Sequence, residues 1–254
     1  MPEDKISSTT NNHALTKNWF TSWFDTPYYH ILYKERNYRE AQLFMDNLTQ
    51  YLNLPKKAKV LDLACGKGRH AIYLSQLGFT VLGADLSENN IAEASRNNNS
   101  NLSFSVHDMR EPFEEKFDAI FNLFTSFGYF EKESDNLKTL IAIKESLSET
   151  GFAVIDFMNV NQVIETLVPE ETKTVDNLTF HIKRYVSDGY ICKEIRFEDQ
   201  GEQYHFTEKV RAFSLSDFEH LMQEAGIYLL DIFGDYKLKK FHKIESERLI
   251  MIFK

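Results

Sequence analysis

The chain has 254 residues, of which 43% are hydrophobic, and its 29 basic and 38 acidic side chains give a formal net charge of −9. An acidic chain without a long basic stripe is unsuited to binding nucleic acid, and no apolar run approaches the roughly 18 residues of a membrane span. The length can bury one large core and a smaller second layer. The two cysteines form no C-x-x-C pair, which suits the reducing cytoplasm where we expect the protein to act.

Residues 1–54 are expected to form a polar tail and a helical cap in front of the main domain. Residues 1–18 are polar, and a dense cluster of aromatic side chains follows over residues 19–38. Apolar residues at helical spacing over residues 43–52 then predict an amphipathic helix that packs on the main domain.

A short apolar run at residues 60–63 is typical of a strand in a parallel sheet. It stops at a small-residue turn, residues 64–68, and a helical pattern follows up to Gly78. Glycine is needed in such a turn because a side chain would keep a ligand off the backbone. The start of the helix offers free N–H groups and a partial positive charge, so the segment predicts a nucleotide-binding unit.

A second strand and helix follow directly. Residues 79–84 predict the strand, which ends at Asp85, and Ser87 is placed to cap the next helix. Asp85 lies 17 residues after Gly68. This is close to the roughly 20-residue offset at which a carboxylate meets the ribose hydroxyls of a bound nucleotide. The glycine turn and Asp85 together therefore favour a ligand-binding site over a structural turn followed by an ordinary surface aspartate.

Two further strands are predicted over residues 102–106 and 117–121. Asp108 follows the first of them and either meets the ligand or caps a helix over residues 110–116. The loop over residues 122–130 follows the second, at the edge where open α/β sheets bind ligands. Its aromatic and hydroxyl side chains predict a mostly apolar pocket.

The sequence changes character over residues 171–213. Three runs of alternating apolar and polar residues are separated by turns at Asp188-Gly189 and Gln200-Gly201. They predict a three-stranded antiparallel sheet inserted into the main domain, which comprises residues 55–170 and 214–254. A lone sheet of this size must cover its apolar face, so we expect a lid or a dimer element.

Two features beside this insertion concern the main domain. Asp156 and Asn159 lie near the end of the predicted fifth strand and are suited either to reaching the substrate or to a structural role. After the insertion, Ser216 and Glu219 are predicted to form the capping box of the next helix.

Four motifs, D-L-A-C-G-K-G-R-H, G-A-D-L-S, H-D-M-R and F-D-A-I-F-N-L-F, follow one another along the chain. In their order and spacing, residues 61–157 resemble the class I S-adenosylmethionine-dependent methyltransferase superfamily, although Ala64 replaces the first glycine of G-x-G-x-G. The resemblance implies an α/β fold, a doubly wound, mixed seven-stranded Rossmann-like sheet whose last strand is antiparallel. It also implies S-adenosyl-L-methionine as cofactor and S-adenosyl-L-homocysteine as product.

The resemblance also implies roles for particular residues. In the family, an acidic residue at the position of Asp108 accepts a hydrogen bond from the adenine amino group, and the next residue touches the ring. Tyr29, Tyr33 and Arg36 share one face if they are helical. Arg36 is suited either to grip the cofactor carboxylate or to pair with a neighbouring glutamate on the surface. The predicted cofactor-binding residues are Tyr33, Arg36, Asp62, Ala64, Cys65, Gly66, Gly68, His70, Asp85, Leu86, Asp108, Met109, Asn122 and Leu123.

We predict a methyltransferase that passes a methyl group to a small-molecule acceptor by in-line displacement. The candidates for a catalytic base, chosen by location, are Tyr28, Tyr29, His30 and Tyr129. No metal site and no nucleic-acid or membrane partner are expected, and a homodimer through the inserted sheet is one possibility. Two alternatives stay open: an NAD(P)-dependent oxidoreductase, since Gly66-x-Gly68-x-x-Ala71 also fits the dinucleotide pattern, and a non-catalytic cofactor-binding regulator.

Overall fold

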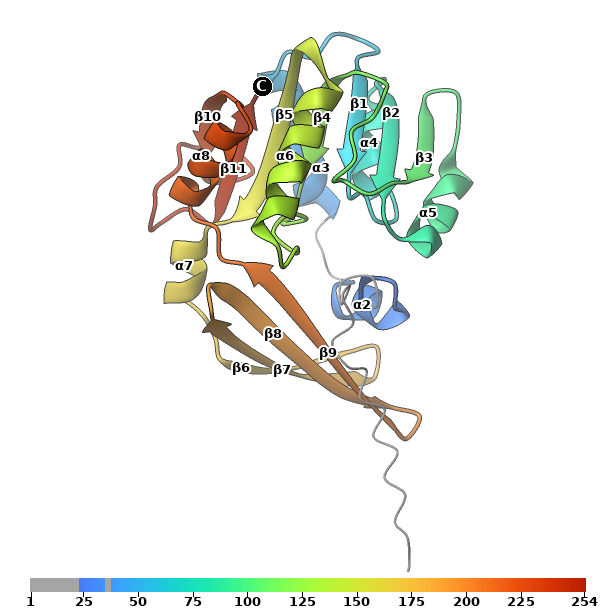
Figure 1. Ribbon diagram of the computed structural model, residues 1–254. Helices are drawn as coiled ribbons and strands as arrows, with labels where there is room; N and C mark the ends of the chain where they lie inside the picture. Colours follow the sequence, from blue (N-terminus) through green and yellow to red (C-terminus); the bar gives the residue numbers. More distant parts are fainter. Residues whose placement is uncertain (1–22, 35–37) are drawn as a thin grey trace, which may run out of the picture.

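Two β-sheets organise the computed structural model, which describes residues 23–34 and 38–254 (Figure 1). The larger one, the main sheet, has the strand order β10-β11-β5-β4-β1-β2-β3. Its strands are β1 (Lys59–Leu63), β2 (Thr80–Asp85), β3 (Leu102–Val106), β4 (Phe117–Asn122), β5 (Leu147–Met158), β10 (Leu229–Phe233) and β11 (Arg248–Phe253). Neighbours pair in parallel except at β11, which is antiparallel to both β5 and β10. The predicted mixed seven-stranded sheet is confirmed.

Helices cover both faces of the main sheet. The elements are α3 (Tyr38–Tyr51) and α4 (Arg69–Gln76) on one face, α6 (Glu133–Ser146) and α8 (Leu215–Glu224) on the other, and the shorter α5 (Glu88–Ala94), η1 (Ser95–Asn97) and α7 (Val160–Glu165). Figure 1 shows α6 in front of the sheet and α3 behind it. In β1, Val60 packs in the core beneath α3 and α4, whereas Leu61 packs in the opposite core. Both faces of β1 are therefore buried, which explains its apolar sequence.

The strand order determines at which edge of the main sheet a ligand can bind. From β1 the chain runs outward to β2 and β3, and it then returns to the other side of β1 to form β4 and β5. The connections on the two sides of β1 diverge at this switch point. They leave a crevice at the carboxyl ends of β1 and β4, where ligands bind in open α/β sheets.

The inserted segment forms a separate antiparallel sheet, the insert sheet, with the order β6-β7-β8-β9. Its strands are β6 (Glu170–Val175), β7 (Leu178–Ser187), β8 (Tyr190–Asp199) and β9 (Glu202–Arg211). The prediction of three strands was wrong by one, because β6 was not recognised. β6 is a polar edge strand that is mostly exposed, so it lacks the alternation that marks a half-buried strand.

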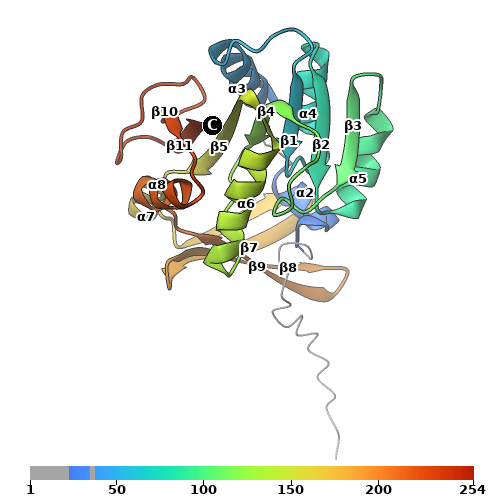
Figure 2. The same ribbon diagram turned by 45° about the horizontal axis from the view of Figure 1, so that its top comes forward.

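The apolar face of the insert sheet is covered by α2 (Pro27–Leu32) and the turn before it. Trp23 and Leu32 form a buried cluster with Phe180 and Phe197 of the insert sheet. Figures 1 and 2 show α2 against this sheet, beyond the end of the main sheet. The face that the sequence left without a partner is thus covered by the same chain.

The helix after the insert begins two residues earlier than predicted. Ser214 caps α8: its hydroxyl accepts from the Asp217 N–H, and the Asp217 carboxylate accepts from the Ser214 N–H. The predicted capping box at Ser216 and Glu219 is therefore wrong. The sequence S-L-S-D-F-E allows a capping box to begin at either Ser214 or Ser216. In the structure the box begins at Ser214, and Phe218 is fully buried beside the main sheet.

Candidate active site

A cavity of about 540 Å³ opens at the carboxyl ends of β1, β2, β3 and β4. One wall, which we call the loop side, consists of lining residues from the segments 62–70, 85–90 and 107–109. The opposite wall, the lid side, contains Phe24, Tyr29, His30, Tyr33, Tyr129, Phe130 and Glu208. The loop side follows the main-sheet strands, whereas the lid side combines α2 and its flanks, the connection after β4 and strand β9 of the insert sheet.

The two glycines of the turn after β1 have different roles. Gly66 has φ of +55° and a Cβ there would meet nothing within 4 Å, so the turn exposes its backbone to the cavity. Gly68 has φ of +78°, does not line the cavity, and packs so closely that a Cβ would lie 2.4 Å from the Phe104 ring. Ala64 is also left-handed, with φ of 63°. The small-residue turn is therefore required partly by backbone conformation and partly by packing on β3.

Asp85 ties the ends of β1 and β2 together. Its Oδ2 accepts from the Gly66 N–H at 2.8 Å, and its Oδ1 accepts from the Ser87 N–H at 2.9 Å. Burial raises the pKa of this carboxyl above its ordinary value. A carboxylate offers about four acceptor positions, so these two bonds leave capacity for ligand hydroxyls.

Asp62 and Cys65 form the buried floor beneath the turn. Asp62 is 2% exposed, accepts from the Ala71 N–H at 3.0 Å, and has its pKa raised by burial to about 7. Burial also raises the pKa of the Cys65 thiol, and the nearby carboxylates of Asp62 and Asp85 add to this effect. A thiol held in its neutral form is a poor nucleophile, so Cys65 serves the cavity as an apolar wall.

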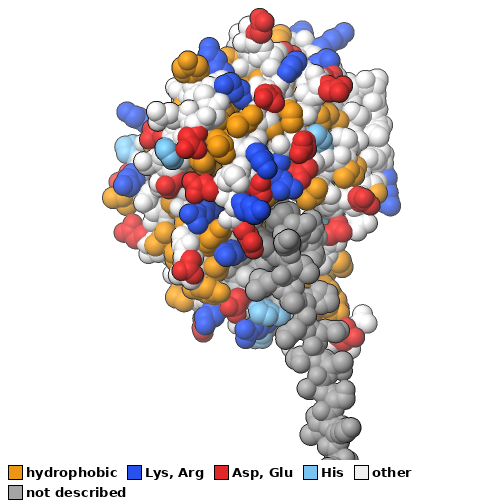
Figure 3. All heavy atoms as spheres, viewed as in Figure 1, with side chains coloured by type: hydrophobic (Ala, Val, Ile, Leu, Met, Phe, Trp, Pro, Cys, Tyr) orange, Lys and Arg blue, Asp and Glu red, His pale blue; other side chains and the backbone are white. Residues whose placement is uncertain are grey.

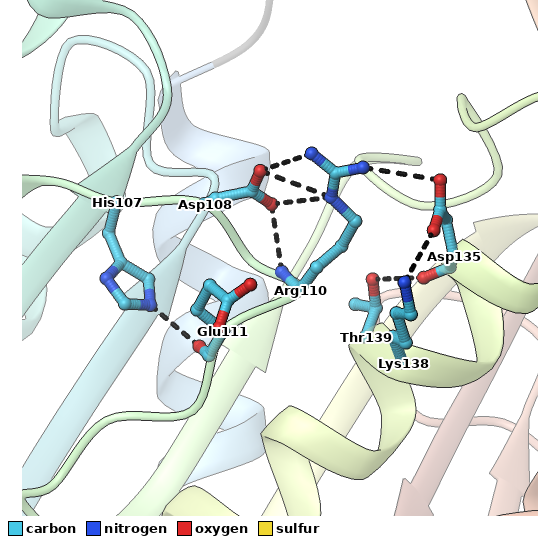
Figure 4. Close-up of polar contacts among 7 residues, drawn as sticks. All are labelled: His107, Asp108, Arg110, Glu111, Asp135, Lys138 and Thr139. Atoms are coloured by element: carbon cyan, nitrogen blue, oxygen red, sulfur yellow. Dashed lines mark hydrogen bonds and ion pairs between the residues drawn. The ribbon is translucent and has the colours of Figure 1, made fainter.

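Asp108 is held in the cavity wall by Arg110 (Figure 4). Arg110 Nε donates to both carboxylate oxygens, and the Arg110 N–H donates to Oδ1 at 3.0 Å. The guanidinium also contacts Asp135 at the start of α6 and lies 4.9 Å from the centre of the Phe130 ring. These bonds hold the pKa of Asp108 below its usual range. No helix forms over residues 110–116 of the described chain, so Asp108 is not the cap of one.

The connection after β4 has a strained backbone that two buried side chains support. Phe124 and Thr125 have φ of 56° and 61°. Asp156, fully buried, accepts from the Phe124 N–H at 2.8 Å and pairs with Arg248 Nε at 2.7 Å, while Arg248 Nη2 donates to Thr125 Oγ1. The support holds the Phe124 ring stacked on His70, with centres 4.7 Å apart. Strain of this kind persists only where surrounding contacts enforce it.

Of the two predicted roles for Asp156 and Asn159, the structural role holds for both. Asp156 supports the strained connection and does not line the cavity. Asn159 caps α7 and donates to the carbonyls of Lys243 and Ser246, which anchors the loop before β11.

The aromatic residues of α2 divide between the two surfaces that the helix contacts. Tyr29, His30 and Tyr33 line the cavity. Tyr28 does not: its ring packs 4.7 Å from that of Phe197, and its hydroxyl donates to Asp199. Its location removes Tyr28 from the candidates for a catalytic base, since its hydroxyl is directed to the insert sheet.

Most of the other predicted residues come together in one place. The predicted cofactor-binding residues that line the cavity are Tyr33, Asp62, Ala64, Cys65, Gly66, His70, Asp85, Leu86, Asp108, Met109 and Leu123. Asn122 does not line it: its amide is fully buried and donates to the Leu63 carbonyl, joining β4 to β1. Arg36 lies outside the described residues.

The sequence did not reveal Glu208, which lines the cavity from β9. It accepts hydrogen bonds from the Trp23 Nε1–H at 2.8 Å and from the Tyr33 hydroxyl at 2.7 Å. The available signal was a glutamate on the apolar face of a predicted strand, in step with Tyr204 and Phe206. A charge in such a position is costly unless it is paired or meets a ligand.

Fold and cavity together define a nucleotide-binding α/β enzyme, and comparisons with known proteins identify its class. A methyltransferase domain model matches residues 60–151. A protein named as a methyltransferase in Geobacillus sp. (strain WCH70) is 30% identical over 234 residues, 87% of this chain and 93% of the relative. The glycine/sarcosine N-methyltransferase of Aphanothece halophytica is 28% identical over 235 residues, 88% of this chain and 84% of that enzyme. A crystal structure of an S-adenosylmethionine-dependent methyltransferase from Clostridium acetobutylicum ATCC 824 matches with a TM-score of 0.74 at 23% identity, covering 93% of this chain and 98% of that one.

The chain therefore belongs to the class I S-adenosylmethionine-dependent methyltransferases. It is an enzyme of this family, and its cofactor is S-adenosylmethionine. The glycine pattern alone also allowed a nicotinamide oxidoreductase, and the family assignment decides for the methyltransferase. Among the helices of the described residues, none is long and apolar enough to cross a membrane.

Proposed function

We propose that this methyltransferase acts on a small-molecule acceptor that binds between the loop side and the lid side of the cavity. The observation that carries the proposal is the continuity of the cavity: the glycine turn and Asp85 line the same space as Tyr29, Tyr33 and Glu208. A space of about 540 Å³ lies in the range of small-molecule sites. Among the described residues, side chains of α2 and Glu208 of β9 line it opposite the glycine turn, which favours a small acceptor.

The donor and acceptor groups of the loop side fit the cofactor. Asp85 would accept from the ribose hydroxyls, and Asp108 would accept from the adenine amino group beside Met109. The open space at Gly66 fits close approach of a ligand to the backbone. We assign the other predicted lining residues to the same function, with Asp62 and Cys65 beneath the turn.

The bound cofactor supplies a methyl group that is already activated on a sulfonium. The protein therefore needs mainly to hold the acceptor in line with the methyl group and to exclude water. Such positioning can contribute about 7–11 kcal/mol of the barrier at best. Tyr29, His30 and Tyr129 line the lid side and are the candidates for a base where the acceptor must lose a proton.

The relatives and the insert sheet support an enclosed small acceptor. The enzyme of Aphanothece halophytica is named for glycine and sarcosine, which are small molecules. The insert, residues 171–213, serves together with α2 as a lid in this proposal, because the apolar face of the insert sheet packs on α2. This arrangement favours a lid over a dimer element. Two free cysteines fit action in the cytoplasm.

Ligand binding and methyl transfer test the proposal separately. S-Adenosylhomocysteine at about 100 times its Kd should stabilise the fold by roughly 2.7 kcal/mol, whereas NAD should not. Transfer of labelled methyl from S-adenosylmethionine to small amines, phenols, thiols and carboxylates should then identify an acceptor. Binding without transfer to any small molecule, but with transfer to a protein or nucleic acid, would contradict the proposal.

A further inference from the structure

The lid side of the cavity carries an acidic side chain that none of the cofactor roles assigned above uses. Among the described residues, four acidic side chains line the cavity, and three of them, Asp62, Asp85 and Asp108, belong to the loop side. The fourth, Glu208, comes from β9 and reaches the cavity from the insert sheet. Its side chain is only 16% exposed. A carboxylate buried to this extent is costly without compensating partners.

The carboxylate of Glu208 is held in place by the lid itself. The Trp23 Nε1–H and the Tyr33 hydroxyl both donate to Oε1, and the Tyr33 hydroxyl lies 3.0 Å from Oε2. Lys193 Nζ lies 3.8 Å from Oε2 and 4.6 Å from the centre of the Tyr33 ring, and it does not line the cavity. Since a carboxylate has about four acceptor positions, Glu208 keeps capacity for a donor inside the cavity.

Aromatic rings surround the same part of the cavity. Phe24, Tyr29, Tyr33 and Tyr129 line it, and their rings form a connected group: Phe24 is 4.9 Å from Tyr29 and 5.4 Å from Tyr129, and Tyr29 is 4.9 Å from Tyr33. Ring faces attract cations, and the attraction increases when the site is desolvated. Phenol rings together with a fixed carboxylate are a favourable environment for an ammonium group.

We propose that the acceptor is a primary or secondary amine, which enters as an ammonium ion and is recognised by Glu208 within this aromatic group. The proposal rests on the proposed function and specifies its substrate class. A carboxylate acceptor would be repelled by Glu208, and a hydroxyl acceptor would gain only a hydrogen bond without the cation's attraction to the rings.

The reaction on such an acceptor balances with the groups present. The ammonium ion first releases one proton to water, which exposes the nitrogen lone pair. The lone pair forms the new N–C bond to the methyl group as the C–S bond breaks, and that electron pair stays on sulfur as S-adenosylhomocysteine forms. The methylated product carries the positive charge that the sulfonium has lost. Glu208 binds and orients the nitrogen and forms no covalent bond.

Matched acceptors test the substrate class. Glycine, ethanolamine and benzylamine are compared with glycolate, ethylene glycol and benzyl alcohol, in which a hydroxyl replaces the amine, by the S-adenosylhomocysteine formed. We expect transfer to at least one amine and to none of the matched hydroxyl compounds. Transfer to the hydroxyl compounds but not to the amines would overturn the amine proposal and leave the proposed function intact. No transfer to any of the six overturns the amine proposal as well, and only failure to bind S-adenosylhomocysteine counts against the cofactor assignment.

A pair of variants tests Glu208 itself. Glu208→Gln keeps an oxygen for the Trp23 and Tyr33 donors but removes the charge. Glu194→Gln is the control, because Glu194 lies on the opposite face of the same sheet and likewise accepts from a tyrosine, Tyr185. We expect Glu208→Gln to lower kcat/KM for the amine by about tenfold or more, mainly through KM. The Kd of S-adenosylhomocysteine should stay within about twofold in both variants.

The outcomes separate recognition from a structural role. If Glu208 only fastened α2 to the insert sheet, Glu208→Gln would lower kcat with little change in KM, or would weaken cofactor binding and lower the melting temperature. Either result, or unchanged kcat/KM for the amine, overturns the proposal. A selective rise in KM for the amine, absent from Glu194→Gln, supports it.

Discussion

The two sides of the cavity are built over very different distances along the chain. On the loop side, the bonds that fix Asp85 and Asp108 span 19 residues to Gly66 and two residues to Arg110. On the lid side, the bonds to Glu208 span 185 residues from Trp23 and 175 residues from Tyr33. The loop side is therefore assembled by short connections at the end of one sheet. The lid side forms only when two distant segments meet.

In the proposed function, this difference separates binding of the cofactor on the loop side from choice of the acceptor on the lid side. Loop-side groups depend on strand ends and on the glycine turn after β1. The lid-side groups other than Tyr129 and Phe130 belong to α2 with its flanks and to the insert sheet, which form their own buried cluster. On the face seen in Figure 3, basic and acidic side chains are interspersed. We therefore predict that most changes in the lid alter the choice of acceptor more than they alter binding of the cofactor.

The largest loss of stability is expected at the ion pair between Asp156 and Arg248, which supports the connection after β4. Arg248→Met removes the partner of the fully buried Asp156 and leaves a carboxylate unpaired beneath Phe124 and Thr125. The free energy of unfolding should fall by about 3–5 kcal/mol. Urea unfolding measures this loss. As a control, Lys239→Met breaks an exposed ion pair and should cost no more than about 1 kcal/mol. Equal losses in the two variants would show that the buried pair gives no special support.

A smaller loss should distinguish the two loop-side glycines. Gly68→Ala combines a left-handed backbone with a Cβ 2.4 Å from the Phe104 ring, and it should cost about 2–4 kcal/mol of unfolding free energy. Gly66→Ala meets only the backbone strain, about 1–2 kcal/mol, but its Cβ enters the cavity. We therefore expect Gly66→Ala to fold and to lose affinity for S-adenosylhomocysteine in calorimetry. If Gly66→Ala binds normally, the ligand does not approach the turn.

The loop side should also respond to pH through Asp62, whose pKa burial raises to about 7. The folded state holds this proton more tightly than the unfolded state, where the pKa is about 3.9. The resulting stability is complete below about pH 4 and is lost as the pH rises through about 7. Between pH 5 and pH 8 the apo protein should lose on the order of 2 kcal/mol relative to Asp62→Asn, measured by urea unfolding. Parallel pH profiles of the two proteins would show that Asp62 is ionised throughout.

The smallest effect is expected at the contact that joins the lid to the loop side. Asp25, in the turn before α2, accepts from Ser87 Oγ at 2.5 Å and from Asn89 Nδ2 at 2.7 Å. Asp25→Ala should weaken binding of S-adenosylhomocysteine by about threefold, under about 1 kcal/mol. Asp46→Ala, which removes a comparable exposed contact with Tyr73 between α3 and α4, should leave binding unchanged. Stopped-flow dissociation rates compare the two, and identical rates would mean that the lid and the cofactor site are independent.

The sequence predicted the loop side in detail because local signals carry it. Asp85 and the turn at residues 64–68 were placed correctly from strand ends and spacing. Two predicted cofactor-binding residues do not line the cavity: the Gly68 backbone packs against the Phe104 ring, and Asn122 is buried between β4 and β1. No local sequence pattern signals either position, since each depends on which side chain of a neighbouring strand lies opposite the residue.

The family, the mixed main sheet and the cofactor were implied by the resemblance that the four motifs carry. These motifs can be recognised in the sequence because glycine placement and strand-end carboxylates act over a few residues. Only the tertiary structure decided three other features: the extra edge strand β6, the covering of the insert sheet by α2, and the position of Glu208 in the cavity. Each depends on contacts between segments whose separation leaves no periodic trace. The polar sequence of β6 fits a loop as well as an edge strand, and Glu208 reads as a surface glutamate until Trp23 and Tyr33 are placed beside it. Burial of apolar area between distant segments, and the partners it brings to a charge, determine the lid side of the cavity.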